Sequence, residues 1–243
     1  MGIKGFKVDF MDRDDQKVVD FYYRMAAMAA KYHLFIDFHG AYKPTGLSRT
    51  YPNVLNFEGV YGLEQSKWDD DLHQVDYECM IPYIRMVAGN LDYTQGAMDN
   101  ATKYHFKAIY TNPMSQGTRC RQLAEYVIFE SPFNMMCDSP TKYMQNQECV
   151  DFISEVPTVW DETVALDGEL GKYAVIARRK GDTWYVGAIT NWEKRTVEID
   201  LDRIGGISRI GRIYVDGVNA GRNAEDYRID RISGIDGIIR IEL

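Results

Sequence analysis

Apolar residues follow two different periods in the first part of the chain. Continuous apolar runs predict buried strands at residues 3–10, 34–40 and 53–60. Between the first two strands, apolar side chains recur at helical spacing over residues 16–32. Asp12, Asp14 and Asp15 lie just before this helix, where acidic residues suit the positive end of its dipole. Strands that alternate with helices in this way predict a parallel sheet, most economically part of a (β/α)8 (TIM) barrel.

The pattern changes near residue 157. Residues 77–152 have helix and loop sequences, with the clearest helix predicted at 116–129 and a short strand at 134–137. After Trp160, turn residues separate strand-like runs at 173–178, 184–190, 196–201, 210–215 and 238–243. Lys180-Gly181-Asp182 predicts a hairpin turn, and Asp216-Gly217 predicts another. We therefore expect an α/β barrel domain over residues 1–156 and a small all-β sandwich domain over residues 157–243.

Composition narrows the classes of partner. Hydrophobic residues make up 45% of the chain, which is typical of a globular protein. Lys and Arg number 28 against 36 Asp and Glu, and the resulting net charge of −8 argues against nucleic acid as the main partner. No stretch approaches the roughly 18 apolar residues of a membrane helix, so we expect a soluble protein. The four cysteines lack metal-ligand spacing and are expected to be free thiols.

Polar residues lie late in each predicted strand of the first domain, at Asp9, His39 and Glu58. In barrels of this type the carboxyl ends of the strands carry the chemistry. Glycoside hydrolysis needs two carboxyl groups, for which Asp9 and Glu64 are the first candidates. From spacing alone, Asp9 could equally belong to a helix cap with Asp12, and Glu64 could be a solvated surface residue. Glu58 and Glu64 could share a hard cation, although no EF-hand spacing is present.

Several segments resemble glycoside hydrolase family 97. They comprise residues 5–12, 38–46, 49–64 and 92–98, followed by residues 157–163 and 177–185. The family has an N-terminal β-sandwich, a (β/α)8 barrel and a C-terminal β domain, so the resemblance places the first predicted strand near barrel strand four. It also implies that earlier parts are missing, which predicts open barrel edges, self-association through the first strand and poor activity of this chain alone.

The resemblance implies the retaining branch, whose members act on α-galactosides or related α-glycosides. Inverting members have glutamate where this chain has Gly40 and lack the aspartate at the position of Asp9. By this comparison Asp9 is the nucleophile and Glu64 the acid/base of a double displacement. Lys7 would donate to a sugar hydroxyl, and three further residues would line the pocket, namely Asp37, His39 and Asp92.

The resemblance further implies calcium, held by carboxylates that include Glu58 and Glu64, with one more ligand from the N-terminal domain of the family. An oligosaccharide substrate and a periplasmic or extracytoplasmic location are also implied. Two alternatives stay open. The chain could be a non-catalytic or inactive carbohydrate-binding fragment of such an enzyme, or it could derive from an inverting α-glucosidase.

Overall fold

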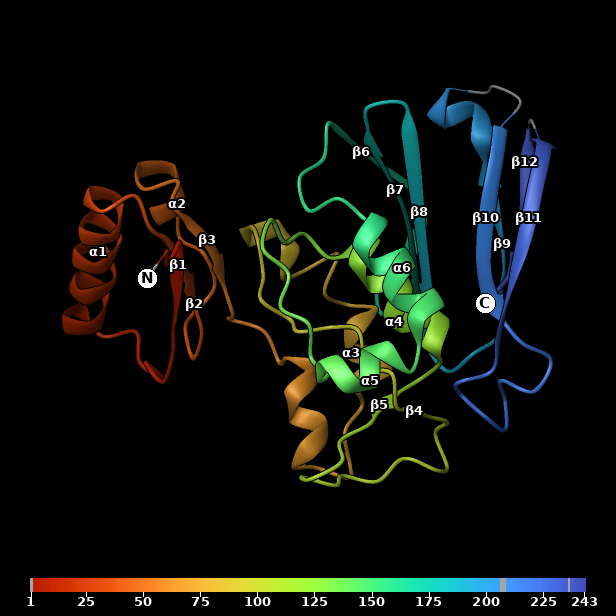
Figure 1. The fold of residues 1–243 in the computed structure, drawn as a ribbon, viewed down its shortest axis with the longest axis horizontal. Coiled ribbons are helices and arrows are strands. Elements are labelled where there is room, and N and C mark those ends of the chain that lie inside the picture. The colour runs from red at the N-terminus through yellow and green to blue at the C-terminus, as the bar shows by residue number, and fades with distance from the viewer. Residues whose placement is uncertain (1, 206–208, 236) are drawn as a thin grey trace.

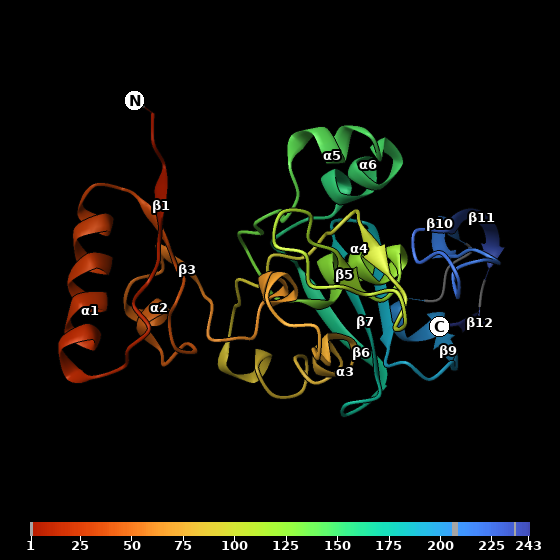
Figure 2. The same cartoon turned by 90° about the horizontal axis from the view of Figure 1, so that it is seen from below.

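The computed structural model describes residues 2–205, 209–235 and 237–243. A small parallel sheet with its helices, a central group of helices and loops, and a set of antiparallel strands follow one another along the longest axis (Figures 1 and 2). The chain is thus a mixed α/β protein with a C-terminal β region. In these residues, no helix is both long enough and apolar enough to cross a membrane. All four cysteines are free thiols, as expected.

The three strands predicted near the N-terminus are all present and pair in parallel in the order β1-β2-β3. They are shorter than predicted, because each ends before the polar residue that closes its apolar run. β1 spans Gly5–Val8, β2 spans Phe35–Phe38 and β3 spans Val54–Phe57, while the short helix α2 (Leu47–Thr50) lies between the last two.

Helix α1 (Gln16–Lys31) covers one face of this sheet. Tyr22 and Ala26 are fully buried and pack against Phe38 and Phe57, so the apolar helical stripe predicted from the sequence is confirmed. Asp15 caps the helix by accepting a hydrogen bond from the Lys17 N–H. The interpretation of Asp9 and Asp12 as a helix cap is therefore wrong.

The central part is built from short elements. They are η1 (Leu63–Lys67), α3 (Gln74–Glu78), η2 (Met86–Ala88), the parallel pair β4 (Asn100–Ala101) and β5 (Ser115–Gln116), and the helices α4 (Arg119–Ile128), α5 (Pro140–Met144) and α6 (Gln147–Glu155). Helix α4 confirms the helix predicted at residues 116–129. The strand predicted at residues 134–137, all of which the structure describes, is absent, because those residues form an irregular loop.

The C-terminal region contains seven strands in three antiparallel sheets of the described chain. They are β6 (Glu162–Glu169), β7 (Tyr173–Lys180) and β8 (Thr183–Thr190); β9 (Thr196–Asp200) with β12 (Ile238–Glu242); and β10 (Arg209–Asp216) with β11 (Tyr227–Ile235). A short helix, η3 (Leu201–Ile204), follows β9. Gly181 adopts a left-handed conformation in the predicted β7–β8 turn. The turn at Asp216-Gly217 begins a longer loop that reaches β11 at Tyr227.

The β6-β7-β8 sheet is packed on both faces. On one face Ile176 and Ile189 join a core with Ile128 of α4, and on the other face Val175 packs with Val197 of β9 and its neighbours. Strand β8 lies so close to α4 that a Cβ added at Gly187 would be 2.8 Å from the Ala124 carbonyl oxygen. The sheet therefore shares its core with residues on the N-terminal side of the predicted domain boundary.

Candidate active site

The three parallel strands end in register, and each is followed at once by a residue of the predicted site. These residues are Asp9, His39 and Glu58. The ladder continues through the first of the following backbone groups, since the His39 N–H donates to the Val8 carbonyl and the Glu58 N–H donates to the Phe38 carbonyl, both at 2.8 Å. The strand ends therefore hold three functional side chains side by side on a rigid backbone.

Asp92 extends this row from a distant part of the sequence. Leu91 forms a parallel bridge with Phe57, and the Asp92 N–H donates to the Phe57 carbonyl at 3.2 Å. The Asp92 side chain is buried, and its Oδ2 lies 2.7 Å from both His39 Nδ1 and Lys7 Nζ. These two contacts lower the pKa of Asp92 against the opposing effect of burial, so the carboxylate is ionised.

His39 joins the remaining carboxylates. Its Nε2 lies 3.2 Å from Glu58 Oε1 and 3.1 Å from Glu64 Oε1, which η1 supplies from its first turn. Burial on its own lowers the pKa of His39, but the hydrogen bonds to Asp92 and Glu64 outweigh it and raise the pKa to about 10. The imidazole is therefore a cation at neutral pH, and its hydrogen bond lowers the pKa of Glu64.

Asp9 and Glu58 lie on either side of the Gly40 backbone. The Gly40 N–H donates to Glu58 Oε2 at 2.7 Å, and the Phe10 N–H donates to Asp9 Oδ1 at 2.6 Å. A Cβ at Gly40 would lie 3.1 Å from Asp9 Oδ1, and Gly40 has a φ of +56°. The position thus requires glycine both for its backbone conformation and for the space that the Asp9 carboxylate takes.

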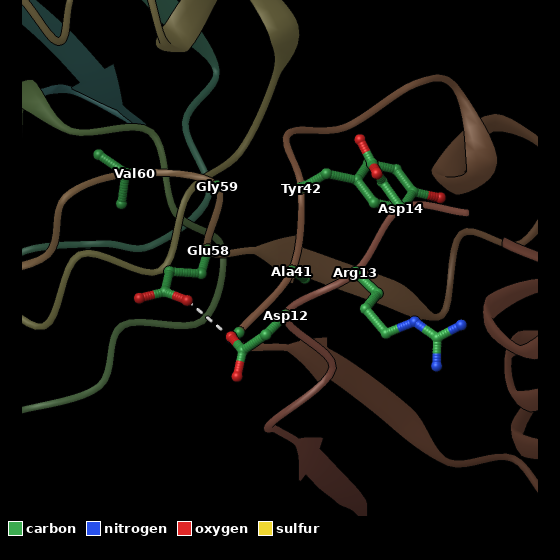
Figure 3. A pocket seen from close by; sticks show the side chains of 9 residues that line it. Asp12, Arg13, Asp14, Ala41, Tyr42, Glu58, Gly59 and Val60 are labelled. Atoms are coloured by element: carbon green, nitrogen blue, oxygen red, sulfur yellow. Dashed lines mark hydrogen bonds between the residues drawn. The ribbon is translucent and has the colours of Figure 1, made fainter. Parts of the chain in front are cut away.

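A cavity of about 380 Å³ opens at this edge of the sheet. The loops that follow β1, β2 and β3 line it, and Figure 3 shows the carboxylates of Asp12 and Glu58 on one side and Tyr42 with Asp14 on another. Polar groups thus surround a space open to solvent at the carboxyl ends of parallel strands. This is the position where ligands bind in open α/β sheets and barrels.

A second polar layer lies two residues before the strand-end residues Asp9, His39 and Glu58. Asp37 is paired in register with Lys7 on one side and Asn56 on the other, and only 2% of its surface is exposed. Among the described residues its two carboxylate oxygens have no hydrogen-bond partner within normal geometry. Burial, and then the charge of Asp92, raise the pKa of Asp37 to about 8.

The predicted site residues lie in one region, because the three parallel strands end side by side. Lys7, Asp37, His39, Glu58, Glu64 and Asp92 form a connected cluster, and Asp9 adjoins it through Gly40. The interpretation of Glu64 as a solvated surface residue is wrong, because its side chain is only 31% exposed and bonds to His39.

Sequence reasoning missed Asp12 and Asn56. Asn56 donates to Ser131 Oγ and to the Phe133 carbonyl, which fixes the loop at residues 131–133 against β3. Its signal was available, because it precedes Glu58 by two residues on a buried strand and therefore shares the same face.

The ligand atoms of His39, Glu58 and Glu64 lie within 4.8 Å of one another. Two converging carboxylates suit a hard cation such as Ca²⁺, which prefers oxygen ligands, whereas the protonated His39 does not. The carboxylate pair therefore fits part of a calcium shell, and His39 provides the neighbouring positive charge in this chain.

The chain is similar to known glycoside hydrolases. A model described as "Glycoside hydrolase 97" matches residues 1–60, and one described as "Glycosyl-hydrolase 97 C-terminal, oligomerisation" matches residues 159–235. The chain is 60% identical over 231 residues to "Retaining alpha-galactosidase" of Bacteroides thetaiotaomicron, covering 95% of this chain and 35% of that protein. It is 29% identical over 216 residues to "Probable retaining alpha-galactosidase" of Streptomyces bingchenggensis, covering 89% and 32%. The chain thus spans about a third of the length of these curated relatives.

Solved structures give the same picture. A family 97 enzyme from a Pseudoalteromonas species in complex with acarbose has a TM-score of 0.83 and 34% identity, covering 95% of this chain and 36% of that one. A structure described as beta-arabinopyranosidase has a TM-score of 0.85 and 28% identity, covering 100% of this chain and 38% of that one.

Proposed function

The chain belongs to glycoside hydrolase family 97, and from that premise we propose that it carries the catalytic carboxylates of a retaining α-galactosidase. The observation that carries the proposal is the pairing of Asp9 with Gly40. The Asp9 carboxylate lies in the space that a side chain at position 40 would need. A carboxylate at position 9 with none at position 40 supports a nucleophile on the strand end and argues against an inverting α-glucosidase, whose family pattern places a glutamate at position 40.

In the first step Asp9 attacks the anomeric carbon and Glu64 protonates the leaving oxygen. The Phe10 N–H holds Asp9 Oδ1, so Oδ2 is the oxygen left to form the bond. His39 keeps Glu64 ionised in the free site, and a bound sugar removes water from Glu64, which favours its protonated form. In the second step the ionised Glu64 deprotonates the water that hydrolyses the glycosyl-enzyme.

Lys7 and the buried acids support these two residues. Lys7 is one-quarter exposed and is held by Asp92, so its remaining N–H groups can donate to a sugar hydroxyl. Asp92 also fixes the His39 ring, and Asp37 lies behind both. We assign Lys7 to substrate binding, and Asp37, His39 and Asp92 to the wall of the pocket that positions Lys7 and Glu64.

The parallel sheet is one wall of a (β/α)8 barrel in this proposal. Two observations support it. Polar side chains occupy one face of the sheet while α1 covers the other, and the wall extends beyond β3 through the Leu91 bridge and then the Leu91 N–H bond to the Glu130 carbonyl. The activity of the whole protein then depends on the strands that complete the barrel.

We assign calcium to Glu58 and Glu64 as an oxygen-ligated cation beside the acid/base. When bound, Ca²⁺ would supply positive charge that orients Glu64 and the substrate. Calorimetric titration of the full-length protein with CaCl₂ tests this assignment independently of activity. Glu58→Gln should weaken the measured affinity at least tenfold, whereas an unchanged affinity would remove Glu58 from the site.

We also propose that the protein self-associates. The C-terminal match to a family described by oligomerisation supports this, and in this chain taken alone the edge strand β1, where Ile3 and Phe6 are about half exposed, offers a second surface. Sedimentation of Phe6→Lys against the unchanged protein separates the two surfaces. If only the C-terminal region associates, the variant keeps the original mass.

Two measurements on the protein at its full natural length test the function. With an α-galactoside, proton NMR should show the α-anomer as the first product, because two inversions retain configuration. Asp9→Gly should lose turnover and recover it with azide, giving the β-galactosyl azide. A first product with inverted configuration, or a fully active Asp9→Gly enzyme, would contradict the assignment.

A further inference from the structure

We propose that Asp12 is a second substrate-binding carboxylate, which accepts a hydrogen bond from the sugar hydroxyl next to the anomeric carbon. This inference rests on the proposed function of Asp9, and it adds a residue and a specificity that the catalytic pair does not supply.

Asp12 does not cap helix α1, although its position in the sequence suggests that role. Helix α1 is capped by Asp15, and the neighbouring Arg13 is bonded to the same Asp15 side chain at 2.5 Å. Among the residues that the structure describes, no hydrogen bond or ion pair reaches the Asp12 carboxylate. It is therefore an exposed acceptor whose neighbours do not satisfy it.

The backbone holds Asp12 in a costly conformation. Its φ is +44°, in the left-handed region that residues other than glycine rarely adopt, and Phe10 two residues earlier has a φ of +64°. The Asp12 N–H donates to the Gly40 carbonyl at 2.7 Å, which ties this loop to the end of β2. Strained residues of this kind are held in place by their surroundings and are concentrated at functional sites.

The strained loop brings Asp12 next to the proposed nucleophile. Asp12 Oδ1 and Asp9 Oδ1 each lie 3.1 Å from the same point, the position of a Cβ on Gly40. Asp12 also lines the cavity, and Figure 3 shows its carboxylate turned toward Glu58 and away from Tyr42. The two aspartates thus lie next to the same point beside Gly40, and Gly40 itself lines the cavity.

The chemistry of the bound sugar decides which group Asp12 meets. The anomeric carbon must lie against Asp9, so the hydroxyl nearest to that carbon, on C2, is the one closest to a neighbouring carboxylate. A carboxylate accepts such a hydroxyl in a strong charge-assisted hydrogen bond. Bonds to this hydroxyl strengthen as the ring becomes oxocarbenium-like, so Asp12 should contribute more in the transition state than in the bound substrate.

A substrate–enzyme cycle tests the inference. The full-length protein and its Asp12→Ala and Asp12→Asn variants are assayed for kcat/KM with 4-nitrophenyl α-galactoside and with its 2-deoxy analogue. The intrinsic reactivity of the two substrates cancels in the ratio of ratios. We expect the preference of the wild type for the 2-hydroxyl substrate to fall at least tenfold in Asp12→Ala, and in part in Asp12→Asn.

Asp20→Ala is the matched control, since it removes the same charge from an exposed position on helix α1 that does not line the cavity. It should leave the preference ratio within about twofold of wild type. If Asp12→Ala lowers both substrates equally, Asp12 only shapes the loop and the inference is wrong. If the wild type cleaves neither substrate, the proposed function itself fails, which is a different outcome.

Discussion

Two clusters of buried charged side chains differ in what their charges face. The strand-end cluster surrounds His39 and adjoins a cavity, and the Glu64 side chain is partly exposed. The second cluster lies between α3 and α4, where Glu78 and Glu125 are fully buried around Arg121. Both combine cations with several acids, yet only the first can reach a ligand.

In the second cluster the Arg121 guanidinium connects several parts of the fold by hydrogen bonds. Arg121 Nε lies 2.5 Å from Glu78 Oε2, and its remaining nitrogens donate to the Val75 and Thr190 carbonyls. Burial, and then the charge of Glu78, raise the pKa of Glu125 well above its usual value, which favours the uncharged form of this acid. Burial of charge therefore does not by itself mark a functional site. An adjoining cavity at the ends of parallel strands does.

The largest effect should come from Glu64→Gln in the strand-end cluster. The amide cannot exchange a proton with the leaving group or with water, so kcat on an unactivated α-galactoside should fall roughly 10⁴-fold. The free energy of unfolding should change by less than about 1 kcal/mol, because Glu64 is partly exposed. Steady-state kinetics and urea unfolding measure the two effects, and a stability loss without an activity loss would reverse the comparison.

Arg121→Met in the second cluster should lower the stability of the protein and leave its activity unchanged. The variant leaves Glu78 without its ion-pair partner and removes the bonds to two carbonyls, so it should destabilise the protein by about 3–5 kcal/mol. The folded fraction should keep its kcat. Urea unfolding at several temperatures checks this prediction, and a stable variant with low kcat would show that this cluster acts on the site.

Asp37→Asn should change how the stability of the protein depends on pH. The pKa of Asp37 is about 8 in the folded protein against 3.8 for the ordinary carboxyl, so the folded state binds more protons between these values. Its contribution to stability therefore falls as pH rises from about 4 to about 8. Relative to wild type, the amide should be neutral at pH 4 and stabilising by about 2 kcal/mol or more at pH 8. A variant that is less stable at pH 8 would show that Asp37 is ionised there.

Gly40→Ala should have a modest effect on stability, because it strains only one residue. Alanine at a φ of +56° costs about 1–2 kcal/mol, and its Cβ would lie 2.9 Å from the Phe10 nitrogen. The same methyl group contacts Asp9, so kcat should fall more than this modest destabilisation suggests. Equal activity with the expected destabilisation would show that Asp9 tolerates displacement.

The sequence predicted the strands and helices correctly where a single hydrophobic period dominates. The apolar runs that end in Asp9, His39 and Glu58 identified three strands, and the register of a parallel sheet then required their polar ends to meet. The exact strand ends were not predictable, because the apolar pattern continues past the last sheet pair. Strand β6 was missed because only Leu166 in it is buried, so the edge strand carries almost no apolar signal.

The partners within the site could not be derived from local patterns. His39 meets Asp92, which is 53 positions later, and Glu64 arrives on a short helix after a loop. Any of the 36 acidic residues could have filled these places by composition alone. Family resemblance selected Glu64 and Asp92, whereas Asp12 was judged a helix residue because its place beside Gly40 depends on an unusual backbone turn.

The close packing of β8 against α4 has a consequence for protein engineering. Because Gly187 has no side chain, β8 packs directly against α4. Arg121 of α4 also donates a hydrogen bond to the Thr190 carbonyl at the end of β8. A C-terminal module transplanted between relatives would have to bring α4 with it. A graft cut at the start of β6 would expose the apolar face that Ile176 and Ile189 now share with Ile128.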